Sequence, residues 1–208
     1  SYVDETDYLN RFVKSCREMD TYDGNLYAVP FRAGPDSWFA NKDMLDAAGL
    51  EIPKFGEEWN WDTFREYAET LRDPDAGTYG IGIVGGNTNG TEWQFWPFLF
   101  QAGGKIIENG KAVFNGPEGV EALEYVCSLI QDDLIPPGIT TTDLNMLQDM
   151  QIAHTLCMWT DGPWMLSTMR NTYPEENICV LPMTTAKTFG NLSGGTSLGM
   201  SSISKHKD

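Results

Sequence analysis

Residues 60–84 read NWDTFREYAETLRDPDAGTYGIGIV and carry the pattern of a helix, a turn and a buried strand. Asn60 is a suitable N-cap, and apolar residues follow it at helical spacing, namely Phe64, Tyr67, Ala68 and Leu71. Residues 73–77 (DPDAG) are a turn signal. In residues 79–84, glycines between Tyr, Ile and Val are typical of a buried strand with close backbone packing. This stretch predicts one helix–strand unit of a layered α/β fold.

The same alternation of elements continues on both sides of this stretch. We expect helices over residues 41–49, 93–102, 117–130 and 164–170, and strands over residues 155–159 and 177–182. The apolar stripe predicted for the third of these helices is Val120, Leu123, Val126, Cys127 and Ile130. Pro117 and Pro163 stand at the first position of their helices, where proline is favoured. The predicted fold class is therefore α/β.

Charge and composition restrict the classes of partner. The chain has 14 basic and 30 acidic side chains, a formal charge of −16, and its 41% hydrophobic content is that of a globular protein. Such a negative surface would repel nucleic acid and anionic lipid headgroups, so neither is an expected partner. No apolar run approaches the roughly 20 residues that cross a bilayer. The abrupt ends lead us to expect a fragment of a longer protein.

Metal and cofactor sites are not predicted. The four cysteines have no Cys-x-x-Cys spacing, and the only histidines are His154 and His206, which argues against zinc and iron–sulfur sites. Cys127 and Cys157 lie in apolar runs, where a free cysteine acts as a small hydrophobic residue. We therefore expect no metal and no cofactor.

The sequence also lacks the common catalytic motifs. Residues 80–85 match Gly-x-Gly-x-x-Gly, but the glycine-rich residues 86–90 that follow are not expected to open a pyrophosphate-binding helix. Glu92 beside Trp93 is the strongest single candidate for a catalytic acid, and no second acid stands near another aromatic loop. We do not expect an enzyme.

Aromatic residues at element boundaries are the stronger signal, and they are Trp38, Trp93, Trp96 and Trp164. Sugars stack their C–H faces on indole rings, and their hydroxyl groups need amide and carboxylate partners. Trp beside Glu, Gln, Asn, Asp or Gly meets both needs. Tryptophan at such boundaries also serves as a core lid, so about half of this set is expected to be structural.

Several strings, in order and spacing, resemble the sugar-binding branch of extracellular solute-binding protein family 1 of ABC importers. They are YAVPF (27–31), NKDMLDAAGL (41–50), WDTF (61–64), YGIG (79–82), QAGG (101–104), GPEGVEAL (116–123), GPW (162–164) and ISK (203–205). The resemblance covers about residues 20–208. Ala40 departs from the usual Tyr, and His154 stands where Gly is common.

The resemblance implies the two-lobed periplasmic-binding-protein-like fold of type II, with ligand held between the lobes. Residues 33–183 would form most of the second lobe. Residues 1–32 and 184–208 would be partial segments of the first lobe, either paired with each other or exposing apolar groups such as Phe12, Leu26 and Leu198. No catalytic residue is implied.

The resemblance also implies ligand-binding residues. Trp164 and Trp93 match stacking aromatics, and the remaining candidates are Glu92, Gln94, Trp96, Asp36, Gly194, Gly195 and Thr196. We expect these residues to line one cleft without a cluster of Arg or Lys, since an unpaired charge buried against a neutral ligand loses hydration. Arg32 is the residue that could overturn this expectation, because its guanidinium could pair with an anionic sugar.

The function implied is the substrate-binding component of an ABC importer that takes a carbohydrate, expected to be an oligosaccharide. Its partners would be the sugar and the permease subunits, and the chain would act as a monomer. The location would be extracytoplasmic, in the periplasm or at the outer face of the cell membrane through a lipid anchor on a removed N-terminal segment. The alternatives are a carbohydrate hydrolase or lyase and a sensory or adhesion module that binds sugar.

Overall fold

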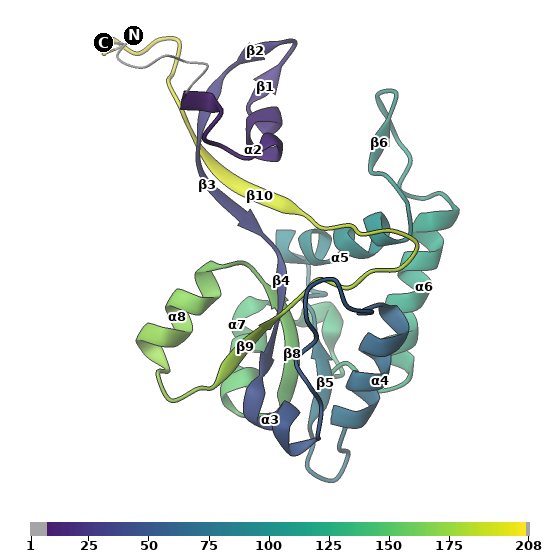
Figure 1. Cartoon of the computed structure of the whole chain (residues 1–208). Helices are drawn as coiled ribbons and strands as arrows, with labels where there is room; N and C mark the ends of the chain where they lie inside the picture. The colour runs from purple at the N-terminus through teal and green to yellow at the C-terminus, as the bar shows by residue number, and fades with distance from the viewer. Residues whose placement is uncertain (1–7, 207–208) are drawn as a thin grey trace. The chain divides into compact units, whose positions relative to one another are not determined.

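The computed structural model describes residues 8–206, which form two compact units (Figure 1). Unit 1 comprises the chain up to Pro35 and from Ser193 onward, and unit 2 is Asp36–Leu192. The chain first passes from unit 1 to unit 2 between Pro35 and Asp36, close to the predicted boundary at residue 33. The second boundary lies beyond the predicted residue 183, because residues 184–190 bond to unit 2: the Thr185 N–H donates to the carbonyl of Trp59, and the Gln101 amide donates to the carbonyl of Gly190. That these units are parts of the first and second lobes stays a prediction.

Unit 2 is built on a four-stranded sheet in the order β5-β8-β4-β9. The strands are β4 (Ser37–Asn41), β5 (Tyr79–Gly82), β8 (Leu156–Asp161) and β9 (Ile178–Leu181). β5 runs parallel to β8, whereas β4 is antiparallel to both β8 and β9. Every residue of β8 is buried, as expected for a strand covered on both faces.

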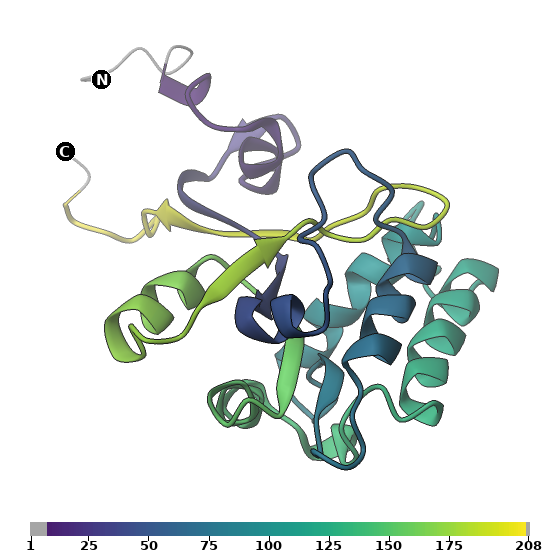
Figure 2. The ribbon, with the colours of Figure 1, turned by 60° about the horizontal axis from the view of Figure 1, so that its bottom comes forward.

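Helices cover both faces of this sheet (Figure 2). One face packs on α4 (Trp61–Leu71), α5 (Asn89–Gln101) and α6 (Pro117–Gln131). The other packs on α7 (Leu144–Ile152) and α8 (Trp164–Thr172). α3 (Lys42–Ala47) follows β4, the short helix η1 (Ile139–Thr141) precedes α7, and β6 (Ile107–Glu108) pairs with β7 (Lys111–Ala112). The α/β class is confirmed.

Two local predictions are wrong. α5 begins at Asn89, so the glycine-rich residues do lead into a helix, where Thr88 takes the extended N-cap conformation. In α6 the buried residues include Ala122, Val126 and Leu129, while Val120 and Leu123 are exposed. The stripe was misplaced because α6 carries apolar residues on two adjacent faces, and periodicity alone does not tell which face meets the core.

Unit 1 contains α2 (Lys14–Met19), β1 (Thr21–Tyr22), β2 (Asn25–Leu26), β3 (Ala28–Pro35) and β10 (Ser193–Gly199). β3 and β10 pair antiparallel, with a register shift between Thr196 and Ser197. Leu26 and Leu198 are exposed, and Phe12 is partly buried. The expected local pairing and exposed apolar groups are both present.

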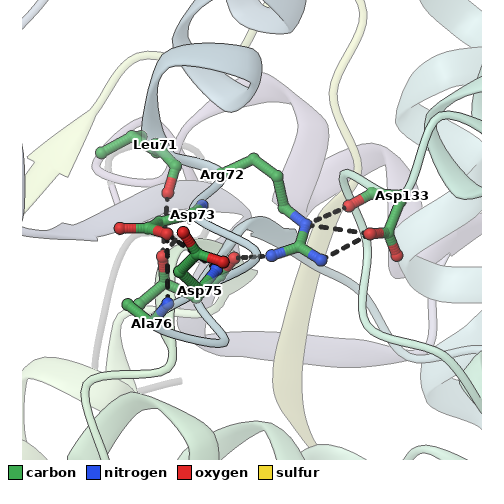
Figure 3. Close-up of polar contacts among 7 residues, drawn as sticks. Leu71, Arg72, Asp73, Asp75, Ala76 and Asp133 are labelled. Atoms are coloured by element: carbon green, nitrogen blue, oxygen red, sulfur yellow. Dashed lines mark hydrogen bonds and ion pairs between the residues drawn. The ribbon is translucent and has the colours of Figure 1, made fainter.

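Arg72 ties the end of α4 to two loops of unit 2 (Figure 3). Its Nε donates to the carbonyl oxygen of Asp133 at 2.8 Å, and its Nη1 donates to that of Thr78 at 2.8 Å. A guanidinium–carboxylate ion pair with Asp133 adds to these bonds. The guanidinium carbon also lies 4.2 Å from the ring centroid of Tyr79. Four separate contacts therefore depend on one side chain that is 12% exposed.

We expect Arg72→Met to lower the free energy of unfolding by about 2 kcal/mol, because it leaves a carboxylate and a carbonyl without their donors. Chemical denaturation measures the change. Lys14→Met is the control, since the Lys14–Glu18 pair is 79% and 65% exposed. It should change stability by less than about 0.5 kcal/mol. Equal effects of the two variants would contradict the role given to Arg72.

Candidate functional site

Trp93 and Trp164 meet in unit 2. Trp93 lies in the first half of α5, and Trp164 begins α8. Their ring centroids are 5.5 Å apart, and the ring planes are inclined by 25°, so the two indoles are stacked. Trp164 is 38% exposed. Two residues separated by 71 positions in the sequence thus form one aromatic surface that solvent reaches.

The segment Asp161-Gly162-Pro163 holds Trp164 in this position. The Asp161 carboxylate accepts a hydrogen bond from the Gly162 N–H at 2.7 Å and another from the Trp164 side chain. The indole folds back over Gly162, where an added Cβ would lie only 2.1–2.5 Å from three ring atoms. Pro163 is the N-cap residue, with φ of −64°, and so fixes where α8 begins. Glycine leaves room for the ring in this position, and any other residue here would displace the indole.

A pocket of about 300 Å³ lies beside the aromatic pair. It is lined by Asn89, Gly90, Trp93, Leu144 and Trp164. These residues bring the N-terminal ends of α5, α7 and α8 to one place. The N-terminal ends of α5 and α8 have no side-chain cap, so backbone N–H groups remain there as hydrogen-bond donors. None of the lining residues is charged, and the predicted acidic residues Glu92 and Asp36 are not among them.

Asp36 is buried at the start of β4, with 1% of its surface exposed. Within residues 8–206, neither oxygen of its carboxyl group has a hydrogen-bond partner. Burial, followed by the negative charge of Asp161, raises the pKa of Asp36 to about 8. Burial also raises the pKa of Asp161, to about 6, against the lowering effect of the hydrogen bonds from Gly162 and Trp164. Near neutral pH, Asp36 is therefore mostly protonated and can donate a hydrogen bond, while Asp161 is mostly ionised.

Three other predicted site residues, Glu92, Gln94 and Trp96, do not line this pocket. Glu92 is exposed in the first turn of α5. Gln94 is buried, and both polar atoms of its amide bond to backbone groups. Trp96 packs against Phe114, with ring centroids 5.7 Å apart, and does not line the pocket. Convergence of all three tryptophans was therefore a wrong expectation, because the Trp96 ring packs on Phe114 and not at the pocket.

Gly194, Gly195 and Thr196 lie in β10 of unit 1. They pair with β3 at Gly34, Ala33 and Arg32 in that order. An added Cβ on Gly195 would lie 2.7 Å from the carbonyl oxygen of Arg32, so glycine is needed for the close strand pairing there. A role of these residues in ligand binding stays a prediction.

A second pocket of about 390 Å³ lies between α5 and α6. Its lining is almost wholly apolar and includes Phe95, Phe98, Phe114, Val120 and Leu123. Such a surface offers few partners for sugar hydroxyl groups, so it fits a carbohydrate poorly.

Within the described part of the chain, no cluster of three or more His, Cys, Asp or Glu is placed to hold a metal ion. None of the helices described there is long and apolar enough to cross a membrane.

Sequence reasoning missed Asn89 and Leu144 as pocket residues, and it gave Asp161 no role at the site. The short string Asp-Gly-Pro-Trp carried a usable signal, because a carboxylate three residues before an indole can reach its N–H. Leu144 had no such signal. It reaches the pocket only through the packing of α7 beside β8.

Comparison with known proteins gives consistent results. The mannitol-binding protein of Pseudomonas aeruginosa is 30% identical over 156 residues, which are 74% of this chain and 35% of that protein. A solute-binding protein of Thermotoga lettingae bound to α-D-tagatose has a TM-score of 0.82 and 25% identity, covering 95% of this chain and 51% of that one. Maltose-bound MalE3 of T. maritima has a TM-score of 0.80 and 22% identity, and the match covers 97% of this chain and 52% of MalE3.

These structures have the two-lobed fold predicted from the sequence, and the chain spans about half the length of the curated relatives it matches. The family model for the bacterial extracellular solute-binding proteins matches residues 2–208. That match covers nearly the whole chain, and the solved relatives share its fold. The chain belongs to the bacterial extracellular solute-binding proteins.

Proposed function

We propose that this chain is part of the substrate-binding component of an ABC importer and that it binds a neutral sugar or sugar alcohol against Trp93 and Trp164. The stacked indole pair at an uncharged pocket is the observation that carries this proposal. A flat aromatic surface with backbone N–H donors beside it suits a ring or chain that has apolar C–H faces and a rim of hydroxyl groups.

The electrostatics of the site favour a neutral ligand over an anionic one. The pocket lining has no Arg or Lys to pair with a carboxylate or phosphate. Asp161 lies beside Trp164 and is mostly ionised near neutral pH, so it would repel an anion. Asp36, mostly protonated under the same conditions, has both carboxyl oxygens buried and does not line this pocket, so it would not bond a ligand held there. The named ligands of two relatives, mannitol and α-D-tagatose, are likewise uncharged.

The mechanism would be closure of two lobes around the ligand, with the closed form recognised by the permease. Closure is favoured only as far as the ligand binds the closed state more tightly than the open state. Gly194, Gly195 and Thr196 of β10 would supply backbone and small side-chain contacts to the ligand. The protein would act as a monomer outside the cytoplasm, held at the membrane by a lipid anchor, and would perform no chemistry on the ligand.

A thermal-shift screen of the complete protein tests this function. The panel contains mannitol, tagatose, maltose, maltotetraose and galacturonate, so it separates short from long and neutral from anionic ligands. A ligand at 100 times its dissociation constant should add about 2.7 kcal/mol of stability. We predict stabilisation by a neutral carbohydrate and, as the sequence suggests, most strongly by an oligosaccharide. Stabilisation by galacturonate alone would overturn the neutral assignment, and release of sugar products would favour the hydrolase or lyase.

A further inference from the structure

Gln94 is buried between two strand ends, next to Trp93 in the sequence. The side chain is 2% exposed. Its Oε1 accepts a hydrogen bond from the Val84 N–H at 2.6 Å, and its Nε2 donates to the carbonyl oxygen of Thr160 at 2.9 Å. Val84 follows β5, and Thr160 is the penultimate residue of β8. One amide group thus connects α5 to the ends of two neighbouring strands.

These hydrogen bonds are made where the β5–β8 ladder has ended. The last paired residues are Gly82 and Trp159, and beyond them the two strands no longer pair with each other. Val84 and Thr160 are both 2% exposed, so their backbone groups need protein partners. The Gln94 amide offers an acceptor oxygen to Val84 and an N–H donor to Thr160, and so it takes the place of a peptide group between the separating strands.

The two strands then lead to the two tryptophans. After Val84 the chain continues through the glycine-rich loop into α5, which carries Trp93. After Thr160 it continues through Asp161 and Gly162 into α8, which begins with Trp164. The spacing between these strand ends therefore determines how the two indole rings meet. We propose that Gln94 is a positioning residue that sets the Trp93–Trp164 stack from inside the fold and does not itself contact the ligand.

The inference rests on the proposed function only for its effect on affinity, because the ring geometry can be measured without any sugar. Trp93 and Trp164 form the only Trp–Trp ring contact among residues 8–206. Two stacked indoles couple excitonically and give a pair of bands of opposite sign in far-ultraviolet circular dichroism. Trp93→Phe removes one indole and so identifies this couplet in the spectrum of the complete protein.

Gln94→Glu is the test variant. Near pH 10, above the pKa of about 8–9 that burial can give a glutamic acid, its carboxylate accepts from Val84 but does not donate to Thr160, whereas near pH 5 the protonated form does both. We expect the couplet to fall by about half or more near pH 10, with about tenfold weaker sugar binding, and to recover near pH 5. Each spectrum is compared with the wild type at the same pH, because Asp36 and Asp161 titrate in this range.

Gln101→Glu is the matched control. Gln101 lies at the end of the same helix and is 0% exposed, and its amide accepts from Trp61 Nε1 at 2.7 Å and donates to the Gly190 carbonyl at 3.0 Å. It should lose stability as Gln94→Glu does but keep the couplet. An unchanged couplet in Gln94→Glu near pH 10 would overturn the positioning role. A couplet that responds as expected in a protein that binds no sugar would support that role and count against the proposed function alone.

Discussion

Replacing Trp164 with alanine is expected to weaken carbohydrate binding by about 30-fold, or roughly 2 kcal/mol, because it removes the more exposed half of the stacked pair. The indole is 38% exposed, so the free energy of unfolding should fall by no more than about 1 kcal/mol. Titration calorimetry on the complete protein, with the ligand found in the thermal-shift screen, measures the affinity, and chemical denaturation measures the stability.

Trp96→Ala is the control for this prediction. Trp96 lies one helical turn from Trp93 but packs on Phe114 and does not line the pocket. Its loss should leave the affinity within about threefold of the wild type, which is less than 1 kcal/mol. If Trp96→Ala abolished binding while Trp164→Ala left it intact, the ligand would lie against another part of α5.

Asp36→Asn should stabilise the protein near neutral pH by roughly 3 kcal/mol. The pKa of Asp36 is raised from 3.8 to about 8, so its contribution to stability is complete below about pH 4 and is lost as the pH rises through 8. At 1.36 kcal/mol for each unit of pKa shift, the loss at pH 7 approaches an upper limit of about 4 kcal/mol. Asparagine stays neutral, so the variant avoids this loss.

Denaturation curves between about pH 4 and pH 9 check this prediction. The two proteins should be similar in stability at the acid end and diverge as the pH rises. Asp161, whose pKa is raised to about 6, adds a slope of the same sign in both proteins, and the variant also lacks the repulsion between Asp161 and Asp36. Asp75→Asn serves as the control, because Asp75 is an exposed turn residue and should show no such divergence. A constant difference across the whole pH range would contradict the prediction.

Local signals were sufficient for much of the fold. The capping box at Asn60 and the apolar spacing after it place α4, since cap and periodicity act within one helix. The start of α5 was missed, because glycine is a poor helix former and only packing decides in favour of the helix there. α6 was found, but its buried face was not, because that choice depends on which surface α5 covers.

Some residues of the candidate site could likewise be predicted from the sequence, and others could not. Trp93 and Trp164 could be proposed from aromatic content and from the family resemblance. The internal role of Gln94 could not, because it depends on Val84 and Thr160, of which Thr160 is 66 positions away in the chain. Asp36 was predicted as a polar contact, but its protonated state follows only from burial and from Asp161, which is far away in the sequence. The role of Gln94 and the protonated state of Asp36 both depend on packing between residues that are far apart in the sequence.

The two ends of unit 2 meet. The Asp36 N–H donates to the carbonyl oxygen of Leu192 at 3.3 Å, and the Asn191 side chain donates to the carbonyl oxygen of Asp36 at 2.9 Å. A module whose ends are adjacent can be inserted into a surface loop of a host protein with little added loop-closure entropy. Residues 36–192 therefore have the adjacent ends that insertion into a loop of a host protein requires. The circular-dichroism couplet of the Trp93–Trp164 pair would show whether the inserted unit is folded.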